Sequence, residues 1–181
     1  TLDRSSAASD VYKRQVTKPT HITQRNGRSR GALLDEFRPY SEQIRFVLLQ
    51  MNGSSFWAYS LWRAPEGADL LESIPFSEEY MQCAGTADAL ALEVRRIEAD
   101  GTPHQYAIGK PGGHRTGEPT EVIHYDDGRH STTVYPHEVF TADEAAVVFY
   151  TYFLTDDVSQ PYELRDLHLS WPKPGSEEGD S

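Results

Sequence analysis

Three short turn sequences constrain the fold of this chain more than any other feature. Asn52-Gly53, Asp100-Gly101 and Asp127-Gly128 each pair residues that tolerate the positive φ of a two-residue hairpin turn. Each pair lies between stretches in which apolar and polar residues alternate, which is the pattern of a half-buried strand. Three such hairpins along one chain predict a mainly antiparallel sheet.

The strands and loops follow from the same patterns. The expected hairpins pair residues 44–48 with 56–62, 90–94 with 106–108, and 122–125 with 132–135. A closing strand should carry Leu167, Leu169 and Trp171 on one face, because they are spaced two residues apart. We expect residues 66–88 to form a loop with a short helix, since Pro75 breaks any long helix there.

One amphipathic helix follows the third hairpin. Thr141 and Glu144 form a Thr-x-x-Glu capping box, which marks the N-terminus of a helix. Ala145, Phe149 and Tyr152 then fall on one face at helical spacing, so this face should pack on the sheet. We therefore expect an α+β fold: a mainly antiparallel sheet of about seven strands (three hairpins plus a closing strand), packed by one principal helix, 142–154.

The chain of 181 residues suits a single domain. We expect this α+β domain at residues 32–174, between a disordered leader, 1–31, and an acidic tail, 175–181. Residues 1–15 resemble the translation of a sequencing adapter, and we expect them to be non-native. Residues 16–31 are polar, basic and aperiodic, which indicates an unstructured segment; a nucleic-acid-binding arm is the alternative.

Charge is distributed unevenly along the chain. The formal net charge is −11, to which residues 1–30 contribute +5 and residues 31–181 contribute −16. A domain this acidic repels phosphate backbones, so we expect no nucleic-acid partner, whereas a basic protein surface would be attracted to it. The alternative is that the charge only maintains solubility.

The sequence also bears on the compartment. No apolar run approaches the roughly 20 residues that a membrane-spanning helix needs. The single cysteine, Cys83, cannot form an internal disulfide, which agrees with a reducing compartment. We expect a cytoplasmic protein that does not act on a membrane.

Motifs for catalysis or metal binding are absent from the sequence. Its seven histidines form no His-x-His or His-Glu-x-x-His motif, and the single cysteine leaves no Cys pair that could complete a metal site with them. The Gly-Lys-Pro-Gly-Gly loop at residues 109–113 lacks the residue order of a phosphate loop. Acidic neighbours, Glu78, Glu79 and Asp88, should raise the pKa of Cys83 and weaken its thiolate. We expect no enzymatic activity, no metal and no cofactor.

Features that suit the binding of a partner are better represented. Acidic pairs recur at three expected loop positions, and the strand at 56–62 is rich in aromatic residues. The predicted partner-binding residues are Glu78, Glu79, Asp126, Asp127, Asp156, Asp157, Trp57 and Tyr59. The acids would form one negative surface that sets association rate and specificity toward a basic target. The alternatives are that the acids are solvated turn residues and that both faces of the aromatic strand are covered.

A family pattern extends from about residue 90 to residue 171. It consists of Tyr-Ala-Ile-Gly-Lys-Pro at 106–111, the Asp127-Gly128 hairpin, the segment 134–139, the helix 142–154 and a closing strand that ends in Trp171. In these features the chain resembles the Imm1 immunity proteins of bacterial toxin systems, small cytosolic antidotes commonly paired with deaminase toxins. The resemblance implies a non-catalytic protein-binding module that neutralises a basic toxin of the deaminase or nuclease type.

Two other functions stay open at this stage. A pocket between sheet and helix, lined by Tyr106, Tyr125, Tyr135 and Tyr152, would indicate a small-molecule-binding domain or an enzyme. An exposed aromatic first hairpin would indicate a structural subunit of a larger assembly. A solid core under a flat acidic face would favour the antidote.

Overall fold

The computed structural model describes residues 20–34, 38–68, 74 and 76–170. The elements, in chain order, are β1 (His21–Arg25), β2 (Ser29–Ala32), α1 (Tyr40–Leu48), β3 (Ala58–Arg63), β4 (Tyr80–Thr86), β5 (Ala89–Ile97), β6 (Pro103–Gly109), β7 (Glu121–Tyr125), β8 (His130–Val134), η1 (Pro136–Glu138), β9 (Val139–Phe140), α2 (Ala142–Thr155) and β10 (Glu163–Asp166). The adapter-like start at 1–15 and the acidic tail at 175–181 lie outside the described residues.

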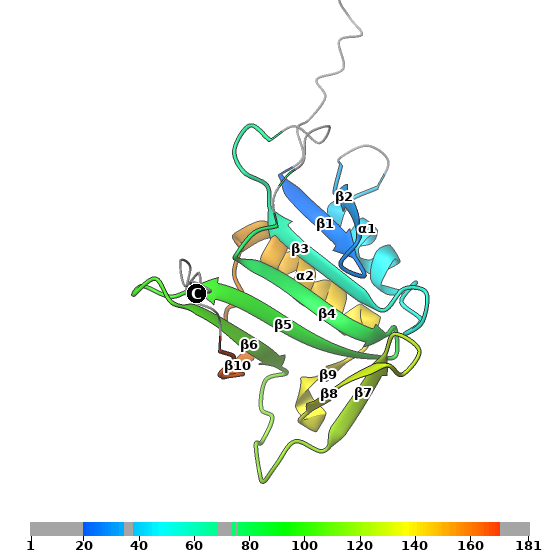
Figure 1. Ribbon diagram of the computed structural model, residues 1–181, viewed down its shortest axis with the longest axis vertical. Coiled ribbons are helices and arrows are strands. Elements are labelled where there is room, and N and C mark those ends of the chain that lie inside the picture. The colour runs from blue at the N-terminus through cyan, green and yellow to red at the C-terminus, as the bar shows by residue number, and fades with distance from the viewer. Residues whose placement is uncertain (1–19, 35–37, 69–73, 75, 171–181) are drawn as a thin grey trace, which may run out of the picture.

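The expected fold class is confirmed. A central antiparallel sheet has the strand order β10-β6-β5-β4-β3-β1-β2, and β9 pairs with β5 beside this path (Figure 1). The hairpin β7–β8 forms a second sheet of two strands. Eight strands therefore make up the main sheet within the described residues, where about seven were expected.

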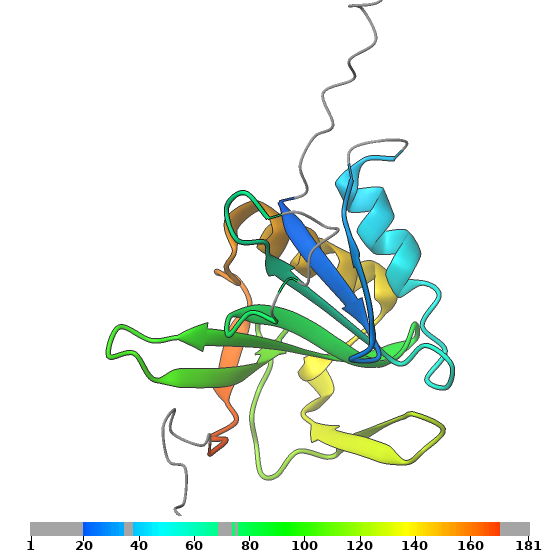
Figure 2. The ribbon, with the colours of Figure 1, turned by 45° about the horizontal axis from the view of Figure 1, so that its top comes forward.

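The two faces of the main sheet are covered by different elements. Helices α1 and α2 contact each other on one face, and β7–β8 lies on the other side (Figure 2). Between helices and sheet, Ile44, Phe149 and Leu92 are fully buried. Each such side chain stabilises the fold by about 1.5–3 kcal/mol. On the opposite face, Ala91 packs against β7–β8 through Ile123.

The main helix begins where its capping box predicts. Thr141 Oγ1 accepts the N–H of Glu144 at 3.4 Å, and the Glu144 carboxylate accepts the N–H of Thr141 at 2.8 Å. The helix ends at Thr155, one residue beyond the expected end, because Asp156 turns into the left-handed region with a φ of 54°. Its buried face includes Phe149 and Tyr152, as expected.

The expected first strand at 44–48 is wrong, since these residues belong to helix α1. Ile44 and Leu48 are buried one helical turn apart, whereas Phe46 between them is 52% exposed. Ile44, Phe46 and Leu48 are spaced by two, which fits a strand, but Ile44 and Leu48 are spaced by four, which fits one face of a helix. Asn52-Gly53 consequently does not join two strands: Asn52 forms an isolated bridge with Thr86 instead.

The expected disorder of the leader is also wrong for its described part. The strands β1 and β2 form a hairpin around Asn26-Gly27, with φ angles of 50° and 64°, and β1 pairs with β3. Asn26-Gly27 is therefore a hairpin signal of the same kind as the three predicted turns. The alternation around it is weak because β1 buries polar residues, His21 and Gln24.

Strands β4 and β10 also differ from the expectation. Strand β4 lies inside the region expected to be a loop with a short helix, and its Met81, Cys83 and Gly85 are buried in alternation. The closing strand β10 ends at Asp166, before the expected Leu167–Trp171; Leu169 is 48% exposed and Trp171 lies outside the described residues. All four residues of β10 are half-buried at the sheet edge, so alternation does not mark this strand.

The second and third hairpins are confirmed. Strands β5 and β6 pair from Glu93 opposite Ala107 to Ile97 opposite Pro103, with the turn at Asp100-Gly101 between them. Strands β7 and β8 pair around Asp127-Gly128, whose φ angles are 55° and 77°. Their turn chemistry is local, so it predicts the hairpins without knowledge of the rest of the fold.

Candidate functional site

The structure separates the three predicted acidic pairs along strand β4. Glu79 directly precedes this strand, so the pair Glu78-Glu79 lies at its start. Asp126-Asp127 lies at its far end, because the N–H of Asp127 donates to the carbonyl of Gly53 at 3.1 Å and the adjacent Asn52 bridges Thr86. Seven residues of strand span roughly 20 Å. The three pairs therefore do not form the one negative surface that the sequence suggested.

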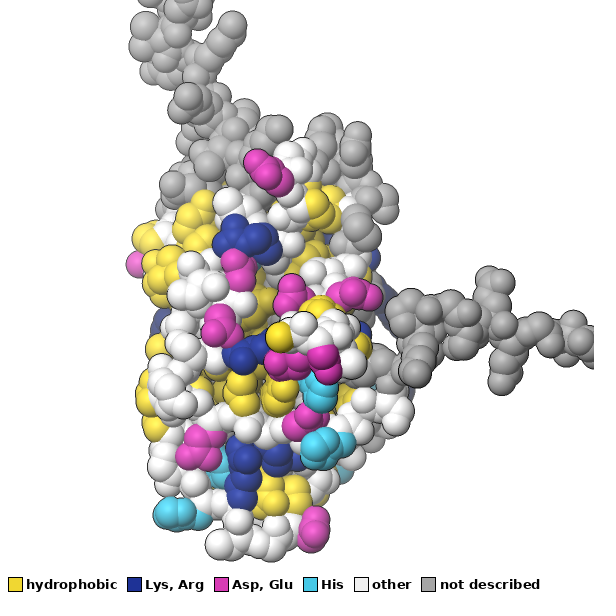
Figure 3. Space-filling model, turned by 90° about the vertical axis from the view of Figure 1, so that its left-hand side faces the viewer, with side chains coloured by type: hydrophobic (Ala, Val, Ile, Leu, Met, Phe, Trp, Pro, Cys, Tyr) yellow, Lys and Arg dark blue, Asp and Glu magenta, His cyan; other side chains and the backbone are white. Residues whose placement is uncertain are grey.

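Three of the six predicted acids come together at the start of β4, because Glu79 accepts the N–H of Ile97 and Asp157 pairs with the adjacent Arg96 beside Asp156; Glu78 is the sequence neighbour of Glu79. Burial raises the pKa of the Tyr152 hydroxyl, and the nearby carboxylates of Asp156, Glu79 and Asp157 raise it further. The Tyr152 hydroxyl therefore lies near acids from the end of α2 and from the segment before β4. We call Glu78, Glu79, Asp156 and Asp157 the acid end. Figure 3 looks onto the side of the molecule that holds the tip of the β5–β6 hairpin and the end of α2, and its acidic side chains are interspersed with arginines and histidines.

Arginines partly neutralise the acid end. Asp157 forms an ion pair with Arg96 of β5, and Asp156 forms one with Arg63 at the end of β3. The side chain of Asp157 remains 51% exposed and that of Asp156 remains 33% exposed. Glu78 and Glu79 are exposed as well, although Glu79 also accepts the N–H of Ile97 at 3.3 Å. The exposed carboxylates therefore outnumber the two arginines that pair with them.

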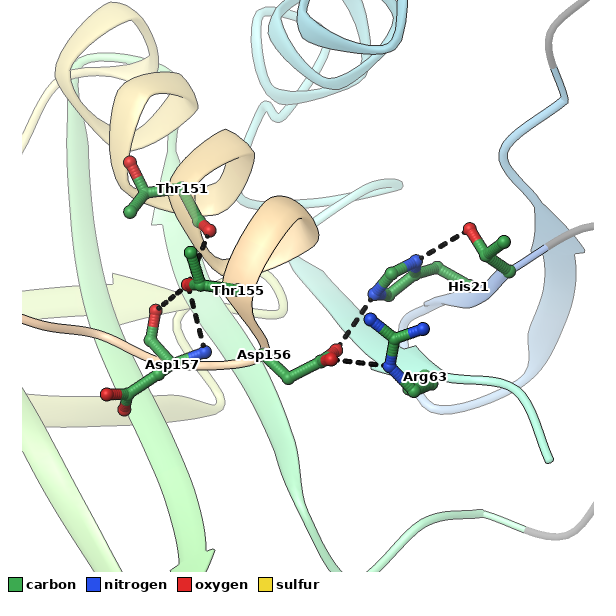
Figure 4. A network of polar contacts seen from close by, with 7 residues as sticks. His21, Arg63, Thr151, Thr155, Asp156 and Asp157 are labelled. Carbon is green, nitrogen blue, oxygen red and sulfur yellow. Dashed lines mark hydrogen bonds and ion pairs between the residues drawn. The ribbon is translucent and has the colours of Figure 1, made fainter. Parts of the chain in front are cut away.

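Asp156 also joins a network that the sequence did not reveal. Its carboxylate meets Nε2 of His21 at 3.0 Å, and Nδ1 of His21 meets the hydroxyl of Thr20 at 3.0 Å (Figure 4). Burial lowers the pKa of His21, and Asp156 only partly offsets this. A neutral His21 therefore donates from Nε2 to Asp156 and accepts from Thr20 at Nδ1.

The order hydroxyl, imidazole, carboxylate is that of a hydrolase triad, but the surroundings differ. His21 is 1% exposed and stacks on Phe153 with ring centroids 4.5 Å apart. None of Thr20, His21 and Asp156 lines either of the two cavities found in the described part of the chain. The imidazole is therefore buried among apolar side chains, and its bonds to Asp156, which also pairs with Arg63, link β1, β3 and the end of α2.

The predicted aromatic residues have different environments. Trp57 is half-buried and stacks on Tyr125 with centroids 5.4 Å apart, at the same end of the molecule as Asp126-Asp127. Tyr59 is 1% exposed and packs against Phe149, so it belongs to the core rather than to an exposed aromatic patch. Both faces of β3 are covered, which was the alternative considered for this strand.

The four tyrosines proposed to line a pocket do not meet. Tyr106 donates to Glu98 at 2.7 Å beside the β5–β6 hairpin, and this bond raises its pKa to about 12. Tyr125 lies on Trp57, and Tyr152 is on the buried face of α2. Neither cavity found in the described residues is lined by any of the four tyrosines.

The larger cavity lies elsewhere, between the β1–β2 hairpin and helix α1. It has a volume of about 620 Å³, and sequence reasoning misses it because Arg25 and Arg30 fall in the segment expected to be disordered. We call it the arginine groove, and it is lined by Thr23, Arg25, Ser29, Arg30, Gly31, Ala32, Leu33, Leu34, Arg38, Gln43, Phe46, Val47 and Tyr59. A second hollow of about 530 Å³ borders the acid end through Arg96 and Asp157.

The remaining candidates for chemistry are Cys83 and the side chains that can bind metal ions. Cys83 is buried, and burial raises the pKa of its thiol; the acidic neighbours proposed from the sequence are not the cause. No group of three or more His, Cys, Asp or Glu side chains within the described ranges could hold a metal ion. Neither helix in this part of the chain has the length and apolarity to cross a bilayer.

Comparison of the chain with protein-family models, with curated proteins and with solved structures found no match. The resemblance of residues 90–171 to the Imm1 immunity proteins therefore stays a prediction.

Proposed function

We propose that this chain is a non-catalytic protein-binding module that docks a basic protein on its acid end. The observation that carries the proposal is the convergence of Glu79 with Asp156 and Asp157 from two distant parts of the sequence, on the neighbouring residues Ile97 and Arg96 of β5. Gathering like charges costs stability, and a basic partner would offset this cost on binding.

The helix backbone adds to the negative potential. Helix α2 ends at Thr155 beside the two aspartates, and its last turn contains no basic residue. The C-terminus of a helix carries roughly half a negative charge, which a cation nearby would neutralise. A lysine or arginine of the partner would therefore meet both carboxylates and the last carbonyls of α2.

The class of partner comes from the resemblance stated above. An immunity protein acts in the cytoplasm on a toxin, and a deaminase or nuclease toxin is basic because its substrate is nucleic acid. The acid end would present carboxylates to the surface that the toxin uses for phosphates. Neutralisation needs only occupancy of that surface, so no catalytic group is required.

Affinity capture followed by a salt titration tests this function. The tagged chain is used to capture proteins from its native host, and a captured basic protein is then titrated against purified chain. We expect E78Q/E79Q to weaken binding about ten-fold at low salt, because two exposed charges facing the partner are lost. The dependence of affinity on salt should also become shallower.

The matched control is E118Q/E121Q, which removes two exposed charges from the loop before β7 and the start of that strand. This variant should bind within about two-fold of the unchanged protein, since its charges lie outside the acid end. Co-expression with the captured protein should protect cells from it. Capture of no basic protein, or equal loss of affinity in both variants, would refute the proposal.

A further inference from the structure

We propose that the arginine groove binds a small organic anion, with its acidic head on the arginines and its apolar body on the groove floor. The ligand class is a carboxylate or phosphate monoester that carries an aliphatic or aromatic body. This inference does not rest on the protein-binding function proposed above, because it uses different residues.

Strand register brings the polar side of the groove together. Arg25 of β1 lies opposite Ser29 of β2 and opposite Tyr59 of β3, so these three side chains form one row across the hairpin. Thr23 of β1 lies in the next row on the same face, opposite Gly31 of β2. A Cβ at Gly31 would lie only 3.3 Å from Oγ1 of Thr23, so glycine leaves the Thr23 hydroxyl uncrowded.

The charge of the lining is the reverse of that of the domain. Arg25, Arg30 and Arg38 line the groove, and none of its lining residues is an aspartate or a glutamate. Within the described residues, no carboxylate lies within ion-pair distance of Arg25 or Arg38. Arg30 contributes no free guanidinium, because its side chain donates to the carbonyl of Ile74 and lies over the ring of Trp62. In a chain of net charge −11, the two guanidinium groups of Arg25 and Arg38, which no carboxylate of the described residues opposes, form a binding site for an anion.

Aromatic rings hold two of these guanidinium groups. Arg25 lies over the ring of Phe56 at 4.8 Å, and Arg38 lies over the ring of Phe46 at 4.5 Å. Stacking orients the planar group and leaves its N–H groups at the edge, where a carboxylate or phosphate can accept two of them. Less side-chain freedom is then lost when the anion binds.

The floor of the groove is apolar and contains one unsatisfied polar atom. Leu33 is 5% exposed, and Phe46 of α1 offers an open ring at 52% exposure. Tyr59 is 1% exposed, and its hydroxyl makes no hydrogen bond of standard geometry, although the side chain of Thr23 lies close enough to interact with it. Buried hydroxyls are nearly always paired, so a ligand group beside Thr23 would complete the bonding of this one.

The volume matches the proposed ligand. Pockets for small molecules are about 300–1,000 Å³ in size, and the groove measures about 620 Å³. Gln43 fixes its α1 wall by donating to the carbonyls of Leu34 and Arg38 at 2.7 and 2.6 Å. The groove is therefore formed before a ligand arrives.

Fluorescence of 8-anilino-1-naphthalenesulfonate, an aromatic anion, tests the inference on the full chain. The dye should bind with increased fluorescence, and R25Q/R38Q should lower its affinity at least about ten-fold, since two charge-assisted contacts are lost. The matched control, R129Q, removes an exposed arginine of the β7–β8 turn that lies outside the groove and should change the affinity less than about two-fold. Equal affinity in all three proteins would overturn the proposal.

Displacement of the dye defines the ligand class. Decanoate or decyl phosphate should displace it, and decanol at the same concentration should not. Whichever of the two anions displaces it at the lower concentration identifies the head group. Displacement by decanol alone would overturn the role of the arginines, and displacement by an acidic peptide but by neither anion would assign the groove to a protein segment instead.

Tyr59→Phe provides a test that does not depend on charge. It removes only the unpaired hydroxyl, so the thermal stability should not fall, whereas decanoate should bind about five-fold more weakly. A loss of stability without a change in affinity would show that the hydroxyl has a structural partner, and would overturn its role toward the ligand.

Discussion

Asp156 illustrates how much a single residue contributes once the chain is folded. In the sequence it is one of two adjacent aspartates at an expected loop position. In the structure its left-handed backbone ends α2, and its carboxylate meets both His21 of β1 and Arg63 of β3. The local sequence around Asp156 predicts a helix end, but its partners lie about 90 and 135 residues away along the chain.

The pH dependence of stability should report on His21. Burial lowers its pKa in the folded state, so the unfolded chain binds a proton more readily between the lowered value and the ordinary 6.5. The contribution of a neutral His21 is therefore fully present above about pH 6.5 and is lost as the pH falls. We expect H21Q to show less loss of unfolding free energy than the unchanged protein between pH 7 and pH 5, measured by urea denaturation.

His104 is the control, because its shift has the opposite sign. A hydrogen bond to Asp166 raises the pKa of His104, so its contribution is present below pH 6.5 and is lost as the pH rises. Removing it in H104Q should make the loss of stability on acidification steeper. The same pH profile in H21Q and the unchanged protein would contradict the assignment to His21.

At the scale of elements, the β4–β5 hairpin depends on one glycine. Gly85 has a φ of 132°, and a Cβ added there would lie 2.2 Å from the carbonyl oxygen of Ala89 and 2.9 Å from a methyl group of Ile123. The close approach brings β4, β5 and β7 together at one point. We expect G85A to lower the unfolding free energy by about 3 kcal/mol or more, measured by chemical denaturation.

Gly101 is the control for Gly85, because an alanine there would meet the strain of a positive φ without a steric clash. It also has a positive φ, of 83°, but no atom lies within 4 Å of an added Cβ. G101A should therefore cost only about 1 kcal/mol, which is the price of the backbone conformation alone. Similar losses in G85A and G101A would show that the contact with Ala89 is relieved by a small shift of the hairpin.

At the scale of the whole molecule, a buried ion pair ties the sheet edge to the segment before α2. Arg165 of β10 donates to both carboxylate oxygens of Glu138 at 2.7 and 2.6 Å, and Glu138 is 1% exposed. Burial alone would raise the pKa of Glu138, but the bonds from Arg165 and from the N–H of Tyr135 hold it below its ordinary value. Edge strand β10 is thereby fixed to η1 as well as to β6.

Breaking this pair should show strong coupling. R165M leaves the Glu138 carboxylate buried without its partner and should lower the unfolding free energy by about 3 kcal/mol. The double variant E138Q/R165M removes the charge but keeps an acceptor for Tyr135, so it should be more stable than R165M alone. Thermal and urea denaturation of both single variants and the double variant measure this coupling, and additive losses would contradict it.

The acid end and the arginine groove also exist only at this scale. The acidic pairs were recognised in the sequence, but which of them meet depends on the strand order and on the path of α2 over the sheet. Arg25 lies in the segment expected to be a disordered leader, and it comes to line the groove only because β1 pairs with β3.

The sequence by itself determined the elements whose signals are local. The capping box at Thr141 and the turns at Asp100-Gly101 and Asp127-Gly128 act within a few residues, so α2, β5–β6 and β7–β8 were predicted correctly and with them the fold class. Tertiary structure decided the rest. Residues 44–48 became a helix because Ile44 and Leu48 pack under α2, and β4 and β10 became strands because neighbouring strands supply their hydrogen bonds. Burial and pairing partners are properties of distant segments, and no pattern inside a short window contains them.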